Sequence, residues 1–294
     1  MSEHKIDNNQ SSTDSIQWYF VASSGATTEH IKKKSQRKDY KQMISYFDDI
    51  SSLSQNDEVV YNRHGIRYVK GYKDLAHQLS VLSNINGEVD FVTLSIGGND
   101  VNFAGIVKDG VVFNSPYITP NKLDNMMAAL WKNFHITRSN LVEVYKDIQD
   151  AVGPQAEIIV TGYPKLFNKT GGGGLVHENE ATIVNENVSL FNIEIEKIVG
   201  KFSDAGMKFH FVNIEKEFDK DGGHMAYTSD PWLEGIIPFA RHEDLDETGV
   251  SAYSVHPNEK GAQAYARCVN AKIAQIVSEK YKKNIHGKIT IADE

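Results

Sequence analysis

The sequence has few of the features that would assign it to a specialised class of protein. Among its 294 residues there is one cysteine, Cys268, which excludes an internal disulfide framework and any metal site built from several cysteines. Basic residues (31) are fewer than acidic residues (39), and the net charge of -8 argues against a general nucleic-acid-binding protein. No run approaches the ~20 apolar residues that a membrane-spanning helix requires. The patterns of zinc proteases and phosphate-binding loops are also missing, so we expect no metal and no cofactor.

The amino-terminal residues are almost wholly polar. Residues 1–15 carry only two large apolar side chains, Met1 and Ile6, and we interpret this segment as a disordered tail. It has no apolar core of the kind found in signal peptides, which predicts a cytoplasmic protein, or a secreted one if the natural amino terminus lies upstream. The remainder, residues 16–294, is expected to form one domain. The sequence leaves the oligomeric state open.

Short apolar runs alternate with longer segments of helical spacing. Strands are predicted over residues 16–22, 89–96, 157–162 and 208–213, together with a hairpin over 58–70 that turns at His64-Gly65. Helices are predicted after Ala26 and over residues 72–82, 123–152, 181–202 and 258–281. This alternation predicts a mostly parallel sheet covered by helices, and such sheets bind ligands beyond the carboxyl ends of their strands. The residues that follow the strands are therefore the candidate site residues.

One such segment is Gly97-Gly98-Asn99-Asp100, which follows an apolar strand. Two glycines let the backbone bend closely around a ligand. The Asn99 amide is a neutral donor, and a neutral donor at a strand end suits a developing oxyanion. Glycine and asparagine are also common in ordinary turns, so the motif alone leaves both interpretations open.

Two further segments are expected at the same edge of the sheet. His256 precedes a helix start at Pro257, and an imidazole titrates near neutral pH, so it suits a general base. The chain has 11 histidines, however, and a single histidine is more often a surface or structural residue. The second segment is Ser24-Gly25-Ala26-Thr27, which could present the backbone amide of Gly25 at the same edge of the sheet. Taken alone, it could also be no more than a turn before a Thr-capped helix.

Four segments, in this order, resemble the SGNH (GDSL-type) hydrolases, and most of all their bacterial lipase and esterase branch. They are residues 20–28, 92–104, 160–167 and 255–261. The resemblance runs over residues 16–280, and the segment around Asn99 is its most specific part. It implies an α/β fold, a three-layer α/β/α sandwich with a flavodoxin-like, mostly parallel sheet.

The resemblance also implies an activity, the hydrolysis of small-molecule or lipid esters by a serine nucleophile without a cofactor. The Asn99 side chain and the Gly25 backbone amide would donate hydrogen bonds to the oxyanion, and His256 would be the general base. Neither nucleic acid nor a transmembrane segment is implied. The acyl chain and the alcohol of the substrate are left open.

One departure from the family pattern concerns the partner of the histidine. The family often has an aspartate three residues before the histidine, and here that position is Tyr253. Some members of this branch orient the histidine with a backbone carbonyl instead. Asp244, Asp246 and Glu247 are nearby acidic residues, though none stands at the matching position.

A second departure concerns the nucleophile. The Gly-Asp-Ser block of the family should precede Gly25, but only Thr13-Asp14-Ser15 lies upstream, and no strand precedes it. The first strand of the fold is therefore predicted to be missing or replaced. Three explanations are open: the sequence begins too late, or residues 287–294 form a strand that takes the central place, or the protein has lost its nucleophile. In the third case the protein would be an inactive acyl- or carbohydrate-binding domain. If the protein is active as it stands, Ser24 is the candidate nucleophile.

Overall fold

A computed structural model describes most of the chain beyond residue 25. The described residues are 19–20, 22, 26–32, 34, 36–43, 57–61, 67–85, 87–107, 122–174, 176–237 and 254–292. The predicted tail over residues 1–15 lies outside them. The statements that follow concern these ranges.

A parallel sheet forms the centre of the molecule. Its strands are β4 (Phe91–Leu94), β5 (Glu157–Thr161) and β6 (Phe209–Val212), in the order β4-β5-β6. Every residue of β5 is buried. All three strands lie within the apolar runs from which the sequence predicts them, and β5 is the one that is buried at every position.

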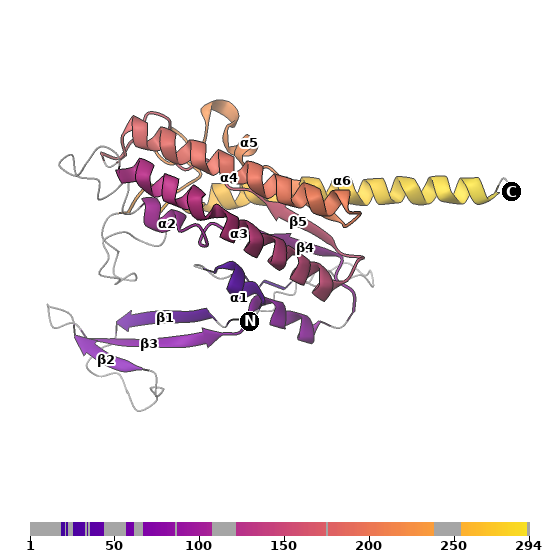
Figure 1. Ribbon diagram of the computed structural model, residues 1–294, viewed down its shortest axis with the longest axis horizontal. Helices are drawn as coiled ribbons and strands as arrows, with labels where there is room; N and C mark the ends of the chain where they lie inside the picture. Colours follow the sequence, from indigo (N-terminus) through magenta and orange to yellow (C-terminus); the bar gives the residue numbers. More distant parts are fainter. Residues whose placement is uncertain are drawn as a thin grey trace.

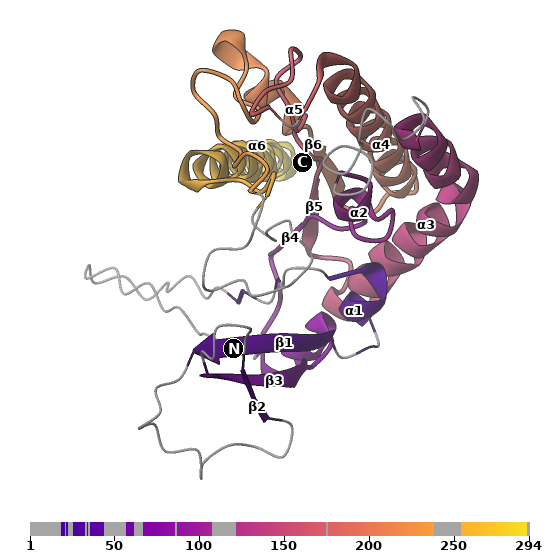
Figure 2. The same ribbon diagram turned by 90° about the vertical axis from the view of Figure 1, so that its left-hand side faces the viewer.

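Long helices cover both faces of this sheet, as Figure 2 shows. α3 (Lys122–Val152) and α4 (Glu178–Asp204) lie on one side, and α6 (Glu259–Ala292) lies on the other. The buried residues of α4 recur every three or four positions, which turns one apolar face to the core. The predicted α/β/α layering is therefore confirmed. In Figure 1 the carboxyl-terminal part of α6 extends beyond the sheet.

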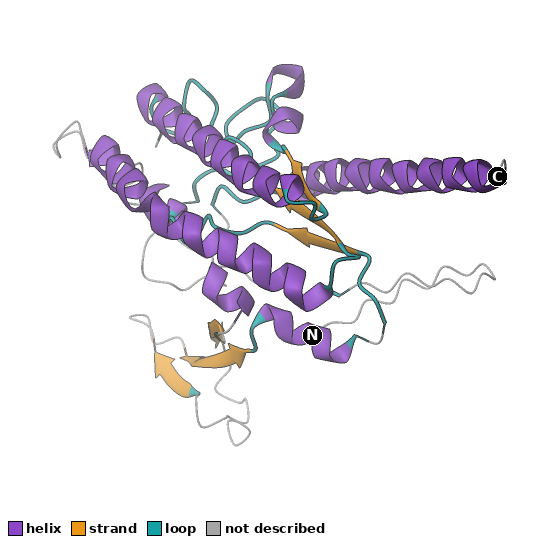
Figure 3. Cartoon of the chain, turned by 45° about the vertical axis from the view of Figure 1, so that its right-hand side comes forward, coloured by secondary structure: helices purple, strands orange, loops and turns teal. Residues whose placement is uncertain are grey.

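A second, antiparallel sheet lies below these layers, next to α1 (Thr28–Lys32), as Figures 1 and 3 show. Its strands are β1 (Gln36–Met43), β2 (Glu58–Tyr61) and β3 (Arg67–Leu75), in the order β1-β3-β2. β2 and β3 confirm the predicted hairpin, although its turn at His64-Gly65 lies outside the described residues. β1 was not predicted, because its charged sequence lacks an alternating pattern.

Two predictions near the amino terminus are wrong. Of the strand predicted over residues 16–22, residues 19, 20 and 22 are described, and they do not belong to a buried strand, since Tyr19 forms a single bridge and Phe20 is 56% exposed. An apolar run cannot reveal whether a partner strand is available to it. Residues 72–75 belong to β3, where Tyr72 pairs with Asp39, and a 3-10 helix, η1 (Gln78–Asn84), follows. The helix prediction over residues 72–82 came from the spacing of its leucines, which carries no information about the pairing of β3 with β1.

The carboxyl terminus corrects a further prediction. Residues 287–292 continue α6, so they do not form a strand that replaces the missing central one. Extending an existing helix is more favourable than forming a short separate strand here, because each residue added to the helix gains a hydrogen bond without a new nucleation cost. Among the described residues, β4 has a sheet partner only in β5. The short elements α2 (Phe103–Ile106), α5 (Glu215–Phe218) and η3 (Lys220–Gly222) complete the fold.

Candidate functional site

The turn after β4 places Asn99 at the carboxyl edge of the parallel sheet. Gly97 begins this turn with a φ of 110°, a conformation that side chains disfavour. Asn99 is exposed, and its Nδ2 donates a hydrogen bond to the Ala26 carbonyl at 2.9 Å. An asparagine amide has two N–H groups, so a second donor remains for a ligand.

Asp100, the next residue, joins this turn to the start of α1. Its carboxylate accepts hydrogen bonds from the Thr28 backbone nitrogen at 3.1 and 3.2 Å and from Thr28 Oγ1 at 2.6 Å. Thr28 is fully buried. Two segments more than 70 residues apart are thereby brought together, as the sequence predicted for Asn99 and the Gly25 region. Gly25 itself and Ser24 lie outside the described residues.

The turn before α6 carries His256. Its Nδ1 lies 3.0 Å from the Ser254 carbonyl oxygen. Because a carbonyl oxygen only accepts, Nδ1 carries a proton, and in the neutral ring the lone pair is then on Nε2. The side chain is exposed, so this nitrogen is open to a proton donor. The Ser254 carbonyl is thus the hydrogen-bond partner of His256 Nδ1, at the place where the family often has an aspartate and this chain has Tyr253. Tyr253, Asp244, Asp246 and Glu247 lie outside the described residues.

Backbone contacts hold the His256 turn in place. The His256 carbonyl accepts from Glu234 N at 2.9 Å, and Asn258 N donates to the Trp232 carbonyl at 3.0 Å. Val255, between Ser254 and His256, has a φ of 54°. A β-branched residue rarely adopts this conformation, and the surrounding contacts must maintain it. Among the described residues, no hydrogen bond joins His256 to Asn99.

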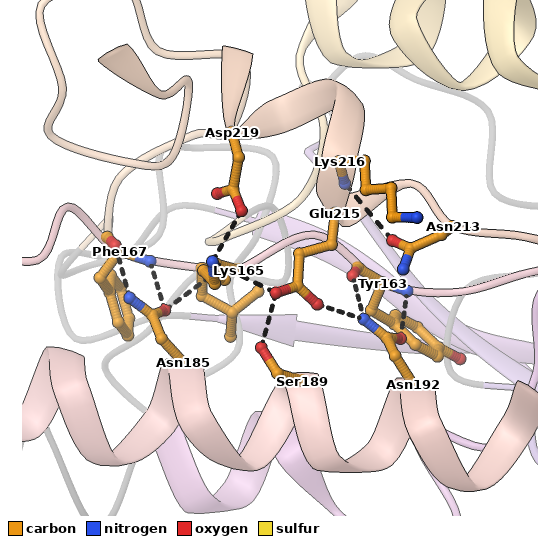
Figure 4. A network of polar contacts seen from close by, with 11 residues as sticks. Tyr163, Lys165, Phe167, Asn185, Ser189, Asn192, Asn213, Glu215, Lys216 and Asp219 are labelled. Atoms are coloured by element: carbon orange, nitrogen blue, oxygen red, sulfur yellow. Dashed lines mark hydrogen bonds and ion pairs between the residues drawn. The ribbon is translucent and has the colours of Figure 1, made fainter.

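The loop after β5 is fixed by α4, as Figure 4 shows. Asn185 accepts from the backbone nitrogens of Leu166 and Phe167 at 2.9 and 3.1 Å and donates to the Phe167 carbonyl at 2.8 Å. Asn192 accepts from Tyr163 N at 2.8 Å and donates to the Tyr163 carbonyl at 2.7 Å. Sequence reasoning missed both asparagines, although polar residues within an apolar helix face are a detectable signal.

A cavity of about 750 Å³ opens beside this loop. Lys165 lines this cavity, and its Nζ lies 2.7 Å from Asp219 Oδ2 and 3.2 Å from Glu215 Oε1. Burial lowers the pKa of Lys165, but its hydrogen bonds with Asp219 and Glu215 outweigh burial and raise the pKa. Neither Asn99 nor His256 lines this cavity.

The described residues include neither a cluster of metal ligands nor a membrane-spanning helix. Among them, no three His, Cys, Asp or Glu side chains gather as metal ligands would. Nor is any described helix long and apolar enough to cross a bilayer.

Comparisons with known proteins bear on this edge of the sheet. The family model GDSL-like Lipase/Acylhydrolase matches residues 7–269. A lipase from Streptomyces rimosus is 28% identical over 165 residues, which cover 53% of this chain and 53% of that protein. The chain therefore spans about half the length of this curated relative.

Two solved structures are similar to the chain. Phospholipase A1 from Streptomyces albidoflavus NA297 gives a TM-score of 0.51 at 24% identity, covering 66% of this chain and 75% of that chain. An extracellular lipase from Streptomyces rimosus gives a TM-score of 0.49 at 23% identity, covering 65% and 72%. The first of these likenesses agrees with the three-layer fold.

The resemblance inferred from four sequence segments is confirmed by the family match. That match includes Asn99 and His256, both of which the structure places in turns at strand or helix ends. The chain belongs to the GDSL-like lipase/acylhydrolase family.

Proposed function

We propose that the protein hydrolyses carboxylic esters of small-molecule or lipid alcohols by acyl transfer to a serine. The observation that carries the proposal is the contact between His256 Nδ1 and the Ser254 carbonyl at 3.0 Å. This contact fixes the tautomer in which the exposed Nε2 accepts a proton, as a general base must. Membership of a lipase and acylhydrolase family supports the same reaction.

In the proposed reaction, His256 Nε2 takes the proton of a serine hydroxyl while its oxygen attacks the ester carbonyl carbon. The Asn99 Nδ2 group and the Gly25 backbone N–H donate to the resulting oxyanion. When the tetrahedral intermediate collapses, the ester C–O bond breaks and His256 returns the proton to the leaving alcohol. Water, deprotonated by His256, then hydrolyses the acyl-enzyme. Ser24 remains the candidate nucleophile.

The competing function is an acyl- or carbohydrate-binding domain that has lost its nucleophile. The family match favours the enzyme, since it is a match to a family of lipases and acylhydrolases. The prediction of a cytoplasmic protein is not supported by the compared proteins, one of which is an extracellular lipase. Secretion is the alternative, and fractionation of the cells that make the protein separates the two.

The test is ester hydrolysis by the purified protein, measured on p-nitrophenyl esters of increasing acyl length and on phosphatidylcholine vesicles. His256→Ala should lower kcat by about 10²–10⁴, the contribution typical of a general base. Asn99→Ala should lower kcat by about 10²–10³, with a smaller change in KM, because the oxyanion forms only in the transition state.

His135→Ala provides the matched control, because His135 is an exposed histidine on α3. It should keep the wild-type kcat. If wild type and His256→Ala are equally active, or if folded wild type cleaves none of these esters, the proposal is wrong.

A further inference from the structure

The backbone N–H of Gly98 has one acceptor, and it is a side chain from another strand end. Gly98 N donates to Tyr163 Oη at 3.1 Å. Tyr163 follows β5, so this bond joins the turns after two neighbouring parallel strands. The hydroxyl therefore fixes the peptide that immediately precedes Asn99.

The fit between Gly98 and Tyr163 is close as well as polar. A Cβ atom built on Gly98 would lie 3.2 Å from Tyr163 Oη and 3.3 Å from two ring carbons. The ring is also packed against Phe191, with centroids 5.7 Å apart. Tyr163 thus supports the turn through both its ring and its hydroxyl, and the two roles are separable by substitution.

Tyr163 is itself held on its backbone. Asn192 of α4, 2% exposed, binds both the N–H and the carbonyl of Tyr163. The same Asn192 amide donates to Glu215 at 3.0 Å, and Glu215 accepts from Ser189 at 2.7 Å. Figure 4 shows these contacts running from α4 to the loop after β5 and to Glu215 at the start of α5. Little freedom is left to the Tyr163 backbone.

We propose that Tyr163 is a positioning residue, which holds the Gly98 peptide and thereby aims the Asn99 amide at the oxyanion. The proposal rests on the proposed ester hydrolysis. Misplacement of a donor by a fraction of an ångström weakens transition-state stabilisation more than substrate binding. Loss of the hydroxyl should therefore appear in kcat rather than in KM.

The test is Tyr163→Phe, which keeps the ring and removes the acceptor of the Gly98 N–H. We expect kcat for the best p-nitrophenyl ester to fall about tenfold, with KM changed less than about twofold. The matched control is Tyr145→Phe, because the Tyr145 hydroxyl is fully buried in α3 and has no hydrogen-bond partner among the described residues. Its kcat should equal that of wild type.

A double-mutant cycle then separates positioning from a general structural effect. In the Asn99→Ala background, Tyr163→Phe should change kcat by less than about twofold, because the donor that it positions is already absent. If Tyr163→Phe costs the same tenfold there, or if folded Tyr163→Phe alone keeps the wild-type kcat, the proposal is wrong.

Hydrogen exchange distinguishes failure of this proposal from failure of the proposed function. The Gly98 amide should exchange faster in Tyr163→Phe than in wild type or Tyr145→Phe, whether or not the protein cleaves esters. Unchanged exchange would overturn the positioning contact even in an active enzyme. Faster exchange in a protein that cleaves no ester would support the contact and leave the proposed hydrolysis as the part that failed.

Discussion

The Asn99 turn and the His256 turn both present an exposed polar side chain, yet they are held by different kinds of contact. The Asn99 turn is held by side-chain contacts, the bond from Gly98 N to the Tyr163 hydroxyl and the bonds that Thr28 donates to the Asp100 carboxylate. The His256 turn pairs through its backbone with the segment around Trp232. The Ser254 hydroxyl also accepts a hydrogen bond from Ile237 N, and Asn258 Nδ2 donates to the Pro231 carbonyl. Removal of the Asp100 carboxylate should therefore weaken the first turn, and crowding of the Trp232 carbonyl should weaken the second.

The difference also bears on reactivity. In the proposed reaction the oxyanion donor has to be aimed, and removable side-chain contacts hold the turn that carries Asn99. The proposed general base has to keep one tautomer, and a backbone carbonyl, which no substitution removes, sets the tautomer of His256. Three substitutions away from the reacting groups test this contrast.

Asp100→Ala should have the largest effect on stability. It removes the acceptor of the Thr28 N–H and hydroxyl, and Thr28 is fully buried. Since hydrogen bonds to a charged partner contribute about 1.5–3 kcal/mol, we expect a loss of about 2–3 kcal/mol in the free energy of unfolding. Urea denaturation of wild type and variant measures this difference in the free energy of unfolding. Asp150→Ala, an exposed position on α3, is the control, and an equal loss in both variants would contradict the account.

Gly261→Ala should disturb the His256 turn by crowding. A Cβ atom on Gly261 would lie 2.2 Å from the Trp232 carbonyl, which accepts from Asn258 N. We expect the variant to lose about 1–2 kcal/mol in the free energy of unfolding, as overpacking does, and to lose kcat as well.

The control for this prediction is Gly200→Ala in α4, where no atom lies within 4 Å of the new methyl group. Alanine has the higher helix propensity, so this variant should gain about 0.5–1 kcal/mol in the free energy of unfolding and keep the wild-type kcat. A Gly261→Ala protein with unchanged stability and kcat would show that the backbone pairing does not constrain the turn.

The smallest effect is expected at the opposite, amino edge of the sheet. Burial alone would raise the pKa of Glu157, but hydrogen bonds from Lys280 and His210 outweigh burial and lower that pKa. A lowered carboxyl pKa stabilises the folded state above the unfolded pKa, and the gain disappears as pH falls through the folded value. Glu157→Gln should therefore lose stability at neutral pH, by about 1 kcal/mol or less after solvent screening.

The measurement is the free energy of unfolding of both proteins from neutral to acid pH. The difference between wild type and Glu157→Gln should shrink as pH falls, and kcat at neutral pH should be the same. A difference that grows toward acid pH would contradict the assigned pKa shift. A lost kcat would contradict the separation between the two edges of the sheet.

The sequence predicts the layered half of the fold because its local signals agree with its packing. The centre of the buried strand β5 is apolar, and α3 has an apolar face along its whole length. The described residues between 19 and 43 are different, since residues 19, 20 and 22 do not form the predicted buried strand and β1 carries no apolar alternation. Its structure depends on pairing partners that lie elsewhere in the chain.

The candidate site was predictable to a similar degree. Asn99 and His256 stand out because their residue types and neighbours are informative on their own. The groups that hold them do not: the Ser254 carbonyl is a backbone atom, and Tyr163 and Asn192 reach the site across strands and helices. Their contributions follow from tertiary contacts, which no local pattern encodes.

The most direct test of the central claim is labelling of the purified chain with a fluorophosphonate, which reacts with an activated serine, followed by intact mass and peptide mapping. The account predicts one adduct on one serine, kept in His135→Ala and absent from His256→Ala. The absence of any adduct on folded wild type, or a serine adduct that persists in His256→Ala, would contradict it.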